Sequence, residues 1–224
     1  MARAALFDVD GTLVDTNYLH VTAWWEAFRQ AGHDVPMQAV HHAVGLGSDD
    51  LMDHLLGTGR DHEEGAAIST AHKVLYGQYF ERLPALDAAG DLLRTLAARG
   101  WTVVLATSAS GPELDALRKA LDADDVIADT AGAEDVDEGK PAPEPVERAR
   151  RLAGATREDS VYVGDSVWDM EAATRAGVPV IGLLSGGIPR ADLENAGAAE
   201  IYRDPADLLA RLDESLFGSA RRDA

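Results

Sequence analysis

Short apolar segments alternate with amphipathic helical segments along most of this chain. Apolar segments typical of buried strands lie at residues 4–9, 101–106, 126–128, 160–163 and 178–184. Helical patterns lie at residues 88–99, 112–121, 144–153, 169–176 and 204–216. This alternation predicts an α/β fold, in which a parallel sheet has helices on both faces. In such sheets the ligand site lies beyond the carboxyl ends of the strands.

One long segment breaks the alternation. The first two strand segments are separated by about 90 residues without a strong strand pattern. Residues 16–31, 48–56 and 65–83 have helical patterns instead. We therefore predict two domains. A Rossmann-like α/β core is formed by residues 1–14 and 85–224, and an inserted α-helical cap, residues 15–84, lies above the end of the first strand.

The chain is strongly acidic. Its 224 residues include 39 Asp and Glu against 20 Lys and Arg, a net charge of -19. A surface of this sign repels nucleic acid and anionic membranes, so we expect neither as a partner. It also repels a phosphorylated substrate at long range. A site for such a substrate therefore needs local positive charge from a metal, a Lys or backbone N–H groups.

The sequence contains no cysteine, which excludes disulfides, thiol catalysis and zinc–thiolate sites. The N-terminus reaches acidic residues too soon for a signal peptide, and no segment approaches the roughly 20 apolar residues of a membrane span. We therefore expect a cytoplasmic protein. The oligomeric state stays open, with a monomer favoured, and residues 218–224 are expected to form a frayed tail.

Two aspartates follow the first strand segment. Asp8 and Asp10 stand two positions apart and precede Gly11, which allows the chain to turn sharply. Like charges placed together at a strand end are costly, and a divalent cation would offset that cost. Two solvated aspartates at an exposed strand end would give the same short pattern, so this motif alone does not decide the function.

A second acidic pair follows the fourth strand segment. Asp165 lies on the expected strand-to-helix loop, and Asp169 lies near the start of the next helix. Together with Asp8 and Asp10, this pair would complete an oxygen-rich site suited to Mg²⁺. Acidic residues also favour helix N-termini, so a capping role is the alternative for Asp169.

Hydroxyl and cationic side chains complete the candidate site. Thr107 and Ser108 follow the second strand segment, where a hydroxyl and backbone N–H groups can hold a phosphoryl group; a helix N-cap is the alternative. Lys140 is the local cation that such a site needs, although a lone Lys is usually a surface charge. We predict a cis peptide bond between Lys140 and Pro141 that aims the Lys side chain into the site.

In this order, each at a strand end, the motifs resemble those of the haloacid dehalogenase-like superfamily. The family's Asp-x-Asp-Gly-Thr motif matches residues 8–12, and its Ser or Thr after the next strand matches Thr107. Its Lys matches Lys140, and its Gly-Asp-Ser with a later Asp matches residues 164–166 and Asp169. The helical insertion is similar to that of the branch containing phosphoglycolate phosphatases and β-phosphoglucomutases.

The resemblance implies a Mg²⁺-dependent phosphatase that acts on a small phosphorylated metabolite. Asp8 would attack phosphorus and form an aspartyl-phosphate, while Asp10 would act as general acid and then general base. Thr107 and the N–H of Ser108 would hold phosphoryl oxygens, and Lys140 would offset charge. The metal ligands implied by the resemblance are Asp8, Asp10 through its backbone carbonyl, Asp165, and Asp169 as a ligand or a support.

Three residues of the expected cap are candidates for substrate contact. His20 and Trp24 lie one turn apart on one helix face and would reach a substrate when the cap closes, although both residue types are also common in packed cores. Lys73 is a candidate second cation, although solvated helix lysines are more common. The sequence does not identify the substrate, and phosphoglycolate, a sugar or polyol phosphate and a nucleotide monophosphate stay open.

Other activities are less consistent with the motifs. The main alternative is a β-phosphoglucomutase-like phosphosugar mutase. That family carries Glu-Asp where this chain has Gly164 and Asp165, and Lys-Asn where it has Gly111 and Pro112, so both departures favour a phosphatase. Asp10 argues against a dehalogenase, which lacks the second Asp. The complete motif set argues against a regulatory module without turnover, and the helical insertion argues against a response-regulator receiver domain.

Overall fold

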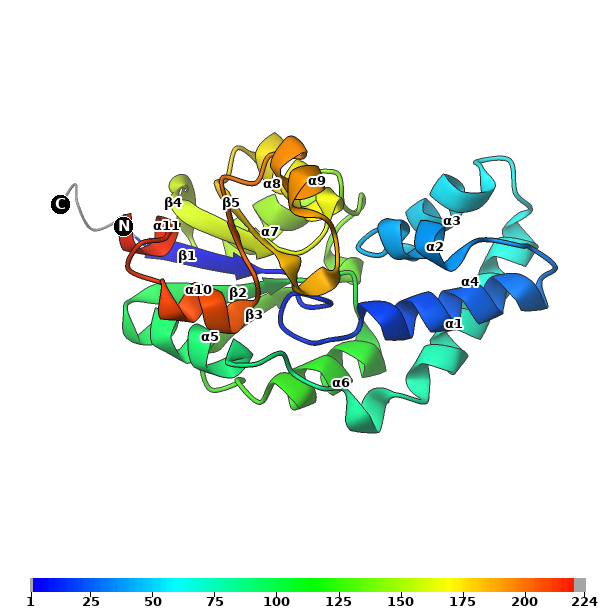
Figure 1. The fold of residues 1–224 in the computed structure, drawn as a ribbon, viewed down its shortest axis with the longest axis horizontal. Helices are drawn as coiled ribbons and strands as arrows, with labels where there is room; N and C mark the ends of the chain where they lie inside the picture. Colours follow the sequence, from blue (N-terminus) through cyan, green and yellow to red (C-terminus); the bar gives the residue numbers. More distant parts are fainter. Residues whose placement is uncertain (1, 220–224) are drawn as a thin grey trace.

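The computed structural model of the chain describes residues 2–219, so residues 220–224 of the expected frayed tail lie outside the described part. Six parallel strands form one sheet in the order β3-β2-β1-β4-β5-β6 (Figure 1). The strands are β1 (Ala2–Phe7), β2 (Trp101–Ala106), β3 (Ile127–Ala131), β4 (Ala155–Gly164), β5 (Val180–Leu183) and β6 (Glu200–Tyr202). The predicted parallel α/β sheet is confirmed.

Helices cover both faces of this sheet. They are α5 (Ala89–Ala98), α6 (Gly111–Leu121), α7 (Glu144–Leu152), α8 (Val167–Ala176), α9 (Arg190–Asn195), α10 (Pro205–Ala210) and α11 (Leu216–Ser219). Side chains of β1 alternate between the two faces. Ala5 and Phe7 join a buried cluster with residues of α5, α6 and α10, whereas Ala4 and Leu6 join one with residues of α7, α8 and α9. Because both faces are covered, β1 is apolar and buried from Ala4 to Phe7.

The connections of the sheet change direction at β1. From β1 the chain continues to β2 and β3 on one side, and then crosses to β4, β5 and β6 on the other. Open α/β sheets bind ligands at such a switch point, outside the carboxyl ends of the strands. The residues that follow the ends of β1 and β4 are Asp8 and Asp165. The topology therefore brings together two motifs that are far apart in sequence.

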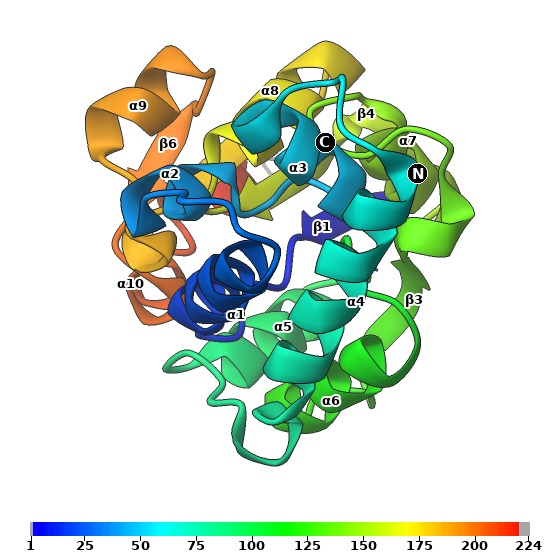
Figure 2. The same cartoon turned by 90° about the vertical axis from the view of Figure 1, so that its right-hand side faces the viewer.

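Four helices form a separate layer at one end of the molecule (Figure 1). They are α1 (Asn17–Gln30), α2 (Met37–Ala43), α3 (Ser48–Leu56) and α4 (His62–Gly77). They enclose an apolar core of their own that includes Phe28, Met52 and Ile68. Seen from that end, β1 lies behind α1, α3 and α4 (Figure 2). We call these four helices the cap; the predicted domain limits at residues 15 and 84 stay a prediction.

Two segments that lie side by side connect the cap to the core. The Asp15 N–H donates to the Pro84 carbonyl, and the Leu86 N–H donates to the Leu13 carbonyl, each at 2.9 Å. The chain therefore enters and leaves the cap at one place.

A second set of contacts joins the cap to the core near α8. Trp168 Nε1 donates to the His42 carbonyl at 2.9 Å, and the Trp168 ring lies edge-on to His54 at 5.4 Å between ring centroids. His41 Nε2 donates to the Gly186 carbonyl at 2.7 Å. These contacts hold the α2–α3 side of the cap against the core.

The structure corrects the helix expected over residues 204–216. The Asp204 side chain caps α10 by accepting a hydrogen bond from the Asp207 N–H at 2.7 Å. The helix ends at Ala210, however. Leu212 and Phe217 are both buried in the core, and residues five apart do not share one helix face. The turn between α10 and α11 allows both side chains to be buried.

The helix expected over residues 65–83 is also shifted. Asp61 caps α4 by accepting from the backbone N–H groups of Glu63 and Glu64 at 2.8 and 3.2 Å, so the helix begins at His62. It ends at Gly77, and a 3₁₀ turn, η1 (Phe80–Arg82), leads back to the core. Four elements were not predicted because they are too short for a clear periodicity: α2, α9, α11 and β6. The frayed tail expected from residue 218 is wrong for residues 218 and 219, which belong to α11. No helix within residues 2–219 is long and apolar enough to cross a membrane.

Candidate active site

Asp8 is the centre of a buried cluster at the end of β1. Its side chain is 8% exposed and accepts hydrogen bonds from Lys140 Nζ and from Thr12 Oγ1, the latter at 3.2 Å. Burial raises the pKa of Asp8 to about 7; Lys140 opposes this shift, whereas Asp169 and Asp10 add to it. A cation placed beside Asp8 would lower this pKa and favour the ionised carboxylate.

Lys140 is fully enclosed at the same site. The Lys side chain is 2% exposed, and its Nζ pairs with Asp8 and lies 2.7 Å from Asp169 Oδ1. Burial lowers the pKa of Lys140, but Asp169 and Asp8 more than compensate and raise it well above its usual range. The predicted cis bond between Lys140 and Pro141 is confirmed. The alternative of a surface charge is therefore wrong for this residue.

Asp165 follows β4 and faces Asp8. Its Oδ1 accepts from Thr12 Oγ1 at 2.8 Å, and its Oδ2 accepts from Asn17 Nδ2 at 2.7 Å. Burial raises the pKa of Asp165 well above its usual range, and the charges of Asp8 and Asp169 raise it further. Thr12 thus bridges Asp8 and Asp165, because its hydroxyl lies within hydrogen-bond distance of both.

Asp169 has two roles in this structure. Its Oδ2 accepts from Ser166 Oγ at 2.6 Å and from the Ser166 N–H at 3.1 Å, in a capping box at the start of α8. Its Oδ1 accepts from the Tyr162 hydroxyl at 2.9 Å and pairs with Lys140. The alternative of a capping role is therefore confirmed, and the same carboxylate also positions the Lys.

These residues fit a divalent cation. Oxygen atoms of Asp8, Asp165 and Asp169 all lie within 4.8 Å of one another, and all three residues are buried. One Lys faces these three carboxylates, and burial together with mutual repulsion raises the pKa values of Asp8 and Asp165. A divalent cation would favour the ionised carboxylates instead, and an all-oxygen donor set suits Mg²⁺. The space is also tight, since a side chain at Gly186 would collide with Asp165.

Asp10 stands apart from this cluster and contacts the start of the cap. Thr16 Oγ1 donates to Asp10 Oδ1 at 2.6 Å, and His20 Nε2 lies 3.2 Å from the same oxygen. Burial raises the pKa of Asp10, but His20 and Thr16 outweigh it, so the pKa is lowered. Burial lowers the pKa of His20, yet Asp10 and Glu113 raise it overall. The His20–Asp10 pair therefore holds its proton on the imidazole.

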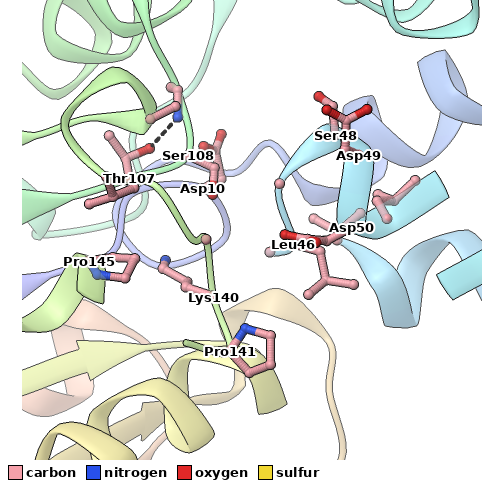
Figure 3. A pocket seen from close by; sticks show the side chains of 18 of the residues that line it. Asp10, Leu46, Ser48, Asp49, Asp50, Thr107, Ser108, Lys140, Pro141 and Pro145 are labelled. Carbon is pink, nitrogen blue, oxygen red and sulfur yellow. Dashed lines mark hydrogen bonds between the residues drawn. The ribbon is translucent and has the colours of Figure 1, made fainter. Parts of the chain in front are cut away.

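Thr107 and Ser108 extend from the end of β2. Thr107 is buried, and its Oγ1 accepts from the Ala109 N–H at 3.1 Å, whereas Ser108 is exposed (Figure 3). Neither residue caps the following helix, because the N-cap of α6 is Ser110. The alternative of a helix cap is therefore wrong for both residues.

A cavity of about 840 Å³ separates the core from the cap. Its walls include eight of the predicted residues: Asp8, Asp10, His20, Trp24, Lys73, Thr107, Ser108 and Lys140. Figure 3 shows Asp10, Ser108 and Lys140 on one side, opposite Ser48, Asp49 and Asp50 from the start of α3. Asp165 and Asp169 are not part of this wall and lie behind Asp8 and Lys140. The geometry thus places a buried carboxylate, a Lys and a hydroxyl at the floor of the cleft between core and cap.

A sequence model of the haloacid dehalogenase-like hydrolase family matches residues 2–177. This chain belongs to the haloacid dehalogenase-like hydrolases. The phosphoglycolate phosphatase of Rhodospirillum rubrum is 30% identical to it over 224 residues, which cover 93% of this chain and 90% of that protein. Family and relatives together identify this haloacid dehalogenase-like hydrolase as a phosphatase.

Solved structures agree with the family. A hydrolase from Pseudomonas syringae is 34% identical, with a TM-score of 0.90 over 95% of this chain and 98% of that chain. The β-phosphoglucomutase of Clostridium difficile has a TM-score of 0.82 over 96% of both chains. Its identity of 18% extends the likeness to the fold alone. The fold of this chain is therefore shared with both solved structures.

Sequence reasoning missed four residues of this haloacid dehalogenase-like site. Thr12 and Asn17 donate hydrogen bonds to Asp165. Their closeness to Asp8 in the sequence, within ten residues, was the only sign that they could belong to the site. His72 stacks on Trp24 with 4.0 Å between ring centroids and contacts His20, but it belongs to another helix. Glu113 was read only as part of α6. Nothing in the sequence indicates that docking of the cap places it near His20.

Proposed function

We propose that this haloacid dehalogenase-like hydrolase is a Mg²⁺-dependent phosphatase of a small phosphorylated metabolite, and that it acts through an aspartyl-phosphate on Asp8. One observation carries the proposal: Asp8 lies at the wall of the cavity, with Lys140 and Thr12 on its oxygens and two further carboxylates behind it. A nucleophilic carboxylate, a fixed cation and a divalent-ion site are the parts that phosphoryl transfer requires.

In the first half-reaction, a carboxylate oxygen of Asp8 attacks phosphorus as the bond to the leaving oxygen breaks. Asp10 is the general acid that gives a proton to that oxygen. His20, whose Nε2 lies 3.2 Å from Asp10 Oδ1, is positioned to share this proton. Thr107 and the Ser108 N–H, at the end of β2, hold oxygens of the transferring group, and Lys140 offsets their charge.

In the second half-reaction, water attacks the phosphorus of the aspartyl-phosphate. Asp10 accepts a proton from this water, and the bond between phosphorus and the Asp8 oxygen breaks to release inorganic phosphate. The lowered pKa of Asp10 favours its ionised form, which is the form that can act as the base. The Thr16 hydroxyl, at 2.6 Å, keeps the Asp10 carboxylate oriented during both steps.

Asp8, the Asp10 carbonyl and Asp165 would hold the Mg²⁺ ion. When bound, it would offset negative charge on Asp8 and on the phosphoryl group. Asp165 is already fixed by Thr12 and Asn17, so it needs little reorganisation to serve as a ligand. Asp169 differs from Asp165 because its Oδ1 is already paired with a cation, Lys140, while its Oδ2 belongs to the capping box of α8. We therefore assign Asp169 a supporting role in which it holds Lys140.

The test is phosphate release from a panel of small phosphate esters, with and without Mg²⁺, for the wild type and Asp8→Asn. Mg²⁺-dependent release that disappears in the variant supports the proposal. Absence of release from every ester contradicts it. Conversion of a sugar phosphate by protein primed with the bisphosphate would instead identify the mutase alternative. A cytoplasmic location and a monomeric state are our further proposals, which fractionation and light scattering would test.

A further inference from the structure

The part of the cavity beyond the phosphoryl-binding floor is acidic. Five carboxylates line it in addition to Asp8 and Asp10, and they come from both domains: Asp49, Asp50, Glu113, Asp137 and Glu138. Figure 3 shows Asp49 and Asp50 on the cap side of the cavity. The organic part of a bound phosphate ester has to occupy this region, because the phosphoryl group occupies the floor.

Few positive groups balance these carboxylates. Arg175 lines the cavity but is engaged, since it donates to the Pro141 carbonyl at 2.8 Å and pairs with Glu171 at 2.7 Å. Asp49 pairs with Arg60 at 3.1 Å. Lys73 lines the same cavity and has no hydrogen bond or ion pair with any residue in the described range 2–219. One uncommitted Lys therefore shares this region with several carboxylates.

Glu113 is the carboxylate closest to the reacting groups. It lies in the first turn of α6, its side chain is 21% exposed, and its Oε1 lies 3.7 Å from His20 Nε2. The same His nitrogen lies 3.2 Å from Asp10 Oδ1, the proposed donor to the leaving oxygen. No residue in the described part of the chain donates a hydrogen bond to Glu113. Its partly exposed carboxylate lines the cavity and can therefore accept a further hydrogen bond beside the position of the leaving group.

We infer that Glu113 determines substrate specificity by accepting a hydrogen bond from a hydroxyl of the leaving group. The preferred substrates are then uncharged polyol or sugar monophosphates, and esters of hydroxy acids such as phosphoglycolate are disfavoured. A hydroxyl of the substrate can donate a hydrogen bond to Glu113 and accept one from Lys73. A carboxylate in the same place can pair with Lys73, but it is repelled by the carboxylates that line this part of the cavity. This inference rests on the proposed phosphatase function and specifies its substrate class.

Three esters with the same two-carbon skeleton test the inference: 2-hydroxyethyl phosphate, 2-phosphoglycolate and 2-aminoethyl phosphate. Assays with Mg²⁺ at pH 8 keep Glu113 mainly ionised, because burial raises its pKa to about 7. We expect kcat/KM for the hydroxyl ester to exceed that for the carboxylate ester by at least about tenfold, as for one charge-assisted hydrogen bond. Glu113→Gln should reduce this ratio by roughly the same factor. The ratio does not depend on the fraction of folded enzyme, because both esters are measured on one preparation.

Asp115→Asn is the matched control, since it removes one carboxylate from an exposed position of the same helix. It should leave the ratio within about twofold of the wild type. Preference of the wild type for 2-phosphoglycolate, an unchanged ratio in Glu113→Gln, or an equal change in Asp115→Asn would overturn the inference. Faster turnover of the amino ester than of the hydroxyl ester would also overturn it, because the acidic wall would then select a cation. Absence of any turnover that depends on Asp8 would overturn the proposed function as well.

Discussion

Asp8 and Asp10 are two residues apart in the sequence, yet their surroundings differ in origin and in charge. The partners of Asp8 come from the core: Thr12, Lys140 and Asp169. The partners of Asp10 come from the start of the cap: Thr16 and His20. The pKa of Asp8 is raised to about 7, whereas that of Asp10 is lowered. The proposed nucleophile therefore has its partners within the core, whereas the proposed acid and base has its partners at the start of the cap.

The largest expected effect separates the two aspartates directly. Asp8→Asn should lower kcat by roughly 10⁴-fold or more, because an amide does not replace the nucleophile. Asp10→Asn should lower kcat by about 10²–10⁴-fold, because the nucleophile remains but the acid and base are lost. Acid quenching with ³²P-labelled substrate distinguishes the two variants. Labelled protein should accumulate in Asp10→Asn and be absent from Asp8→Asn, and the reverse pattern would contradict the assigned roles.

Removal of the buried Lys140 cation should lower the stability of the core. Lys140→Met should lower the free energy of unfolding by about 3–5 kcal/mol, because it leaves Asp8 and Asp169 buried without their partner. Urea unfolding in EDTA measures this loss. Lys119→Met, which removes a surface pair with Glu81, is the control and should cost far less because that pair is exposed to solvent. Equal losses in the two variants would contradict the importance of the buried cluster.

The pH dependence of stability should reflect the raised pKa of Asp8. Between pH 3.8 and about 7 the folded state keeps a proton on Asp8 that the unfolded state has lost. Metal-free protein should therefore lose stability as pH rises through this range, by up to about 4 kcal/mol from this residue. His72, whose pKa is lowered to about 2, acts in the opposite direction below pH 6.5. The contribution of Asp8 is isolated by subtracting the profile of Asp8→Asn. If the difference in stability between the wild type and Asp8→Asn does not change between pH 3.8 and about 7, Asp8 is ionised over this whole range and the prediction is wrong.

Addition of Mg²⁺ should stabilise the protein through the same cluster. At 100 times the dissociation constant, binding to the folded state alone adds about 2.7 kcal/mol to the free energy of unfolding. Asp165→Asn should remove most of this gain, whereas Asp115→Asn should keep it, because Asp115 is exposed on α6. Thermal unfolding with Mg²⁺ or EDTA measures the difference without any need for turnover. An equal gain in Asp165→Asn would place the ion elsewhere.

The smallest expected effect concerns the contacts of the cap. Trp168→Phe removes the hydrogen bond to the His42 carbonyl and keeps an aromatic ring beside His54. We expect a loss of about 1 kcal/mol in stability. If the cap moves during turnover, KM should change more than the rate of the chemical step in single-turnover measurements. Equal changes in both would indicate that Trp168 acts on the core instead.

The candidate site residues whose location the sequence could predict are those that follow strand ends. Asp8, Thr107 and Asp165 each follow a strand of a parallel sheet, and such ends meet at one edge whatever the details of packing. His72 and Glu113 were missed because their proximity to His20 depends on how the cap docks on the core, which no local pattern encodes. For the same reason, Trp24 could be nominated as a cap residue while its stacking on His72 could not.

The errors in the fold have a similar origin. β6 has only three residues, so alternation is not visible in the sequence, and it forms because β5 offers it a free edge. The expected helix over residues 204–216 had good helical propensity throughout. Residues 211–215 form turns instead, and Leu212 within these turns and Phe217 after them are both buried in the core.

The two segments that connect the cap to the core, residues 13–15 and 84–86, are hydrogen-bonded to each other, so the cap could be replaced as a unit. Because its two ends lie next to each other, with Asp15 bonded to Pro84 and Leu86 to Leu13, a foreign helical module whose ends are equally close could be spliced in without stretching the core. The core would keep its nucleophile, cation and metal ligands, while the recognition surface would change as a unit. Hybrids made at this seam offer a direct route from one phosphatase scaffold to a series of enzymes with different substrate preferences.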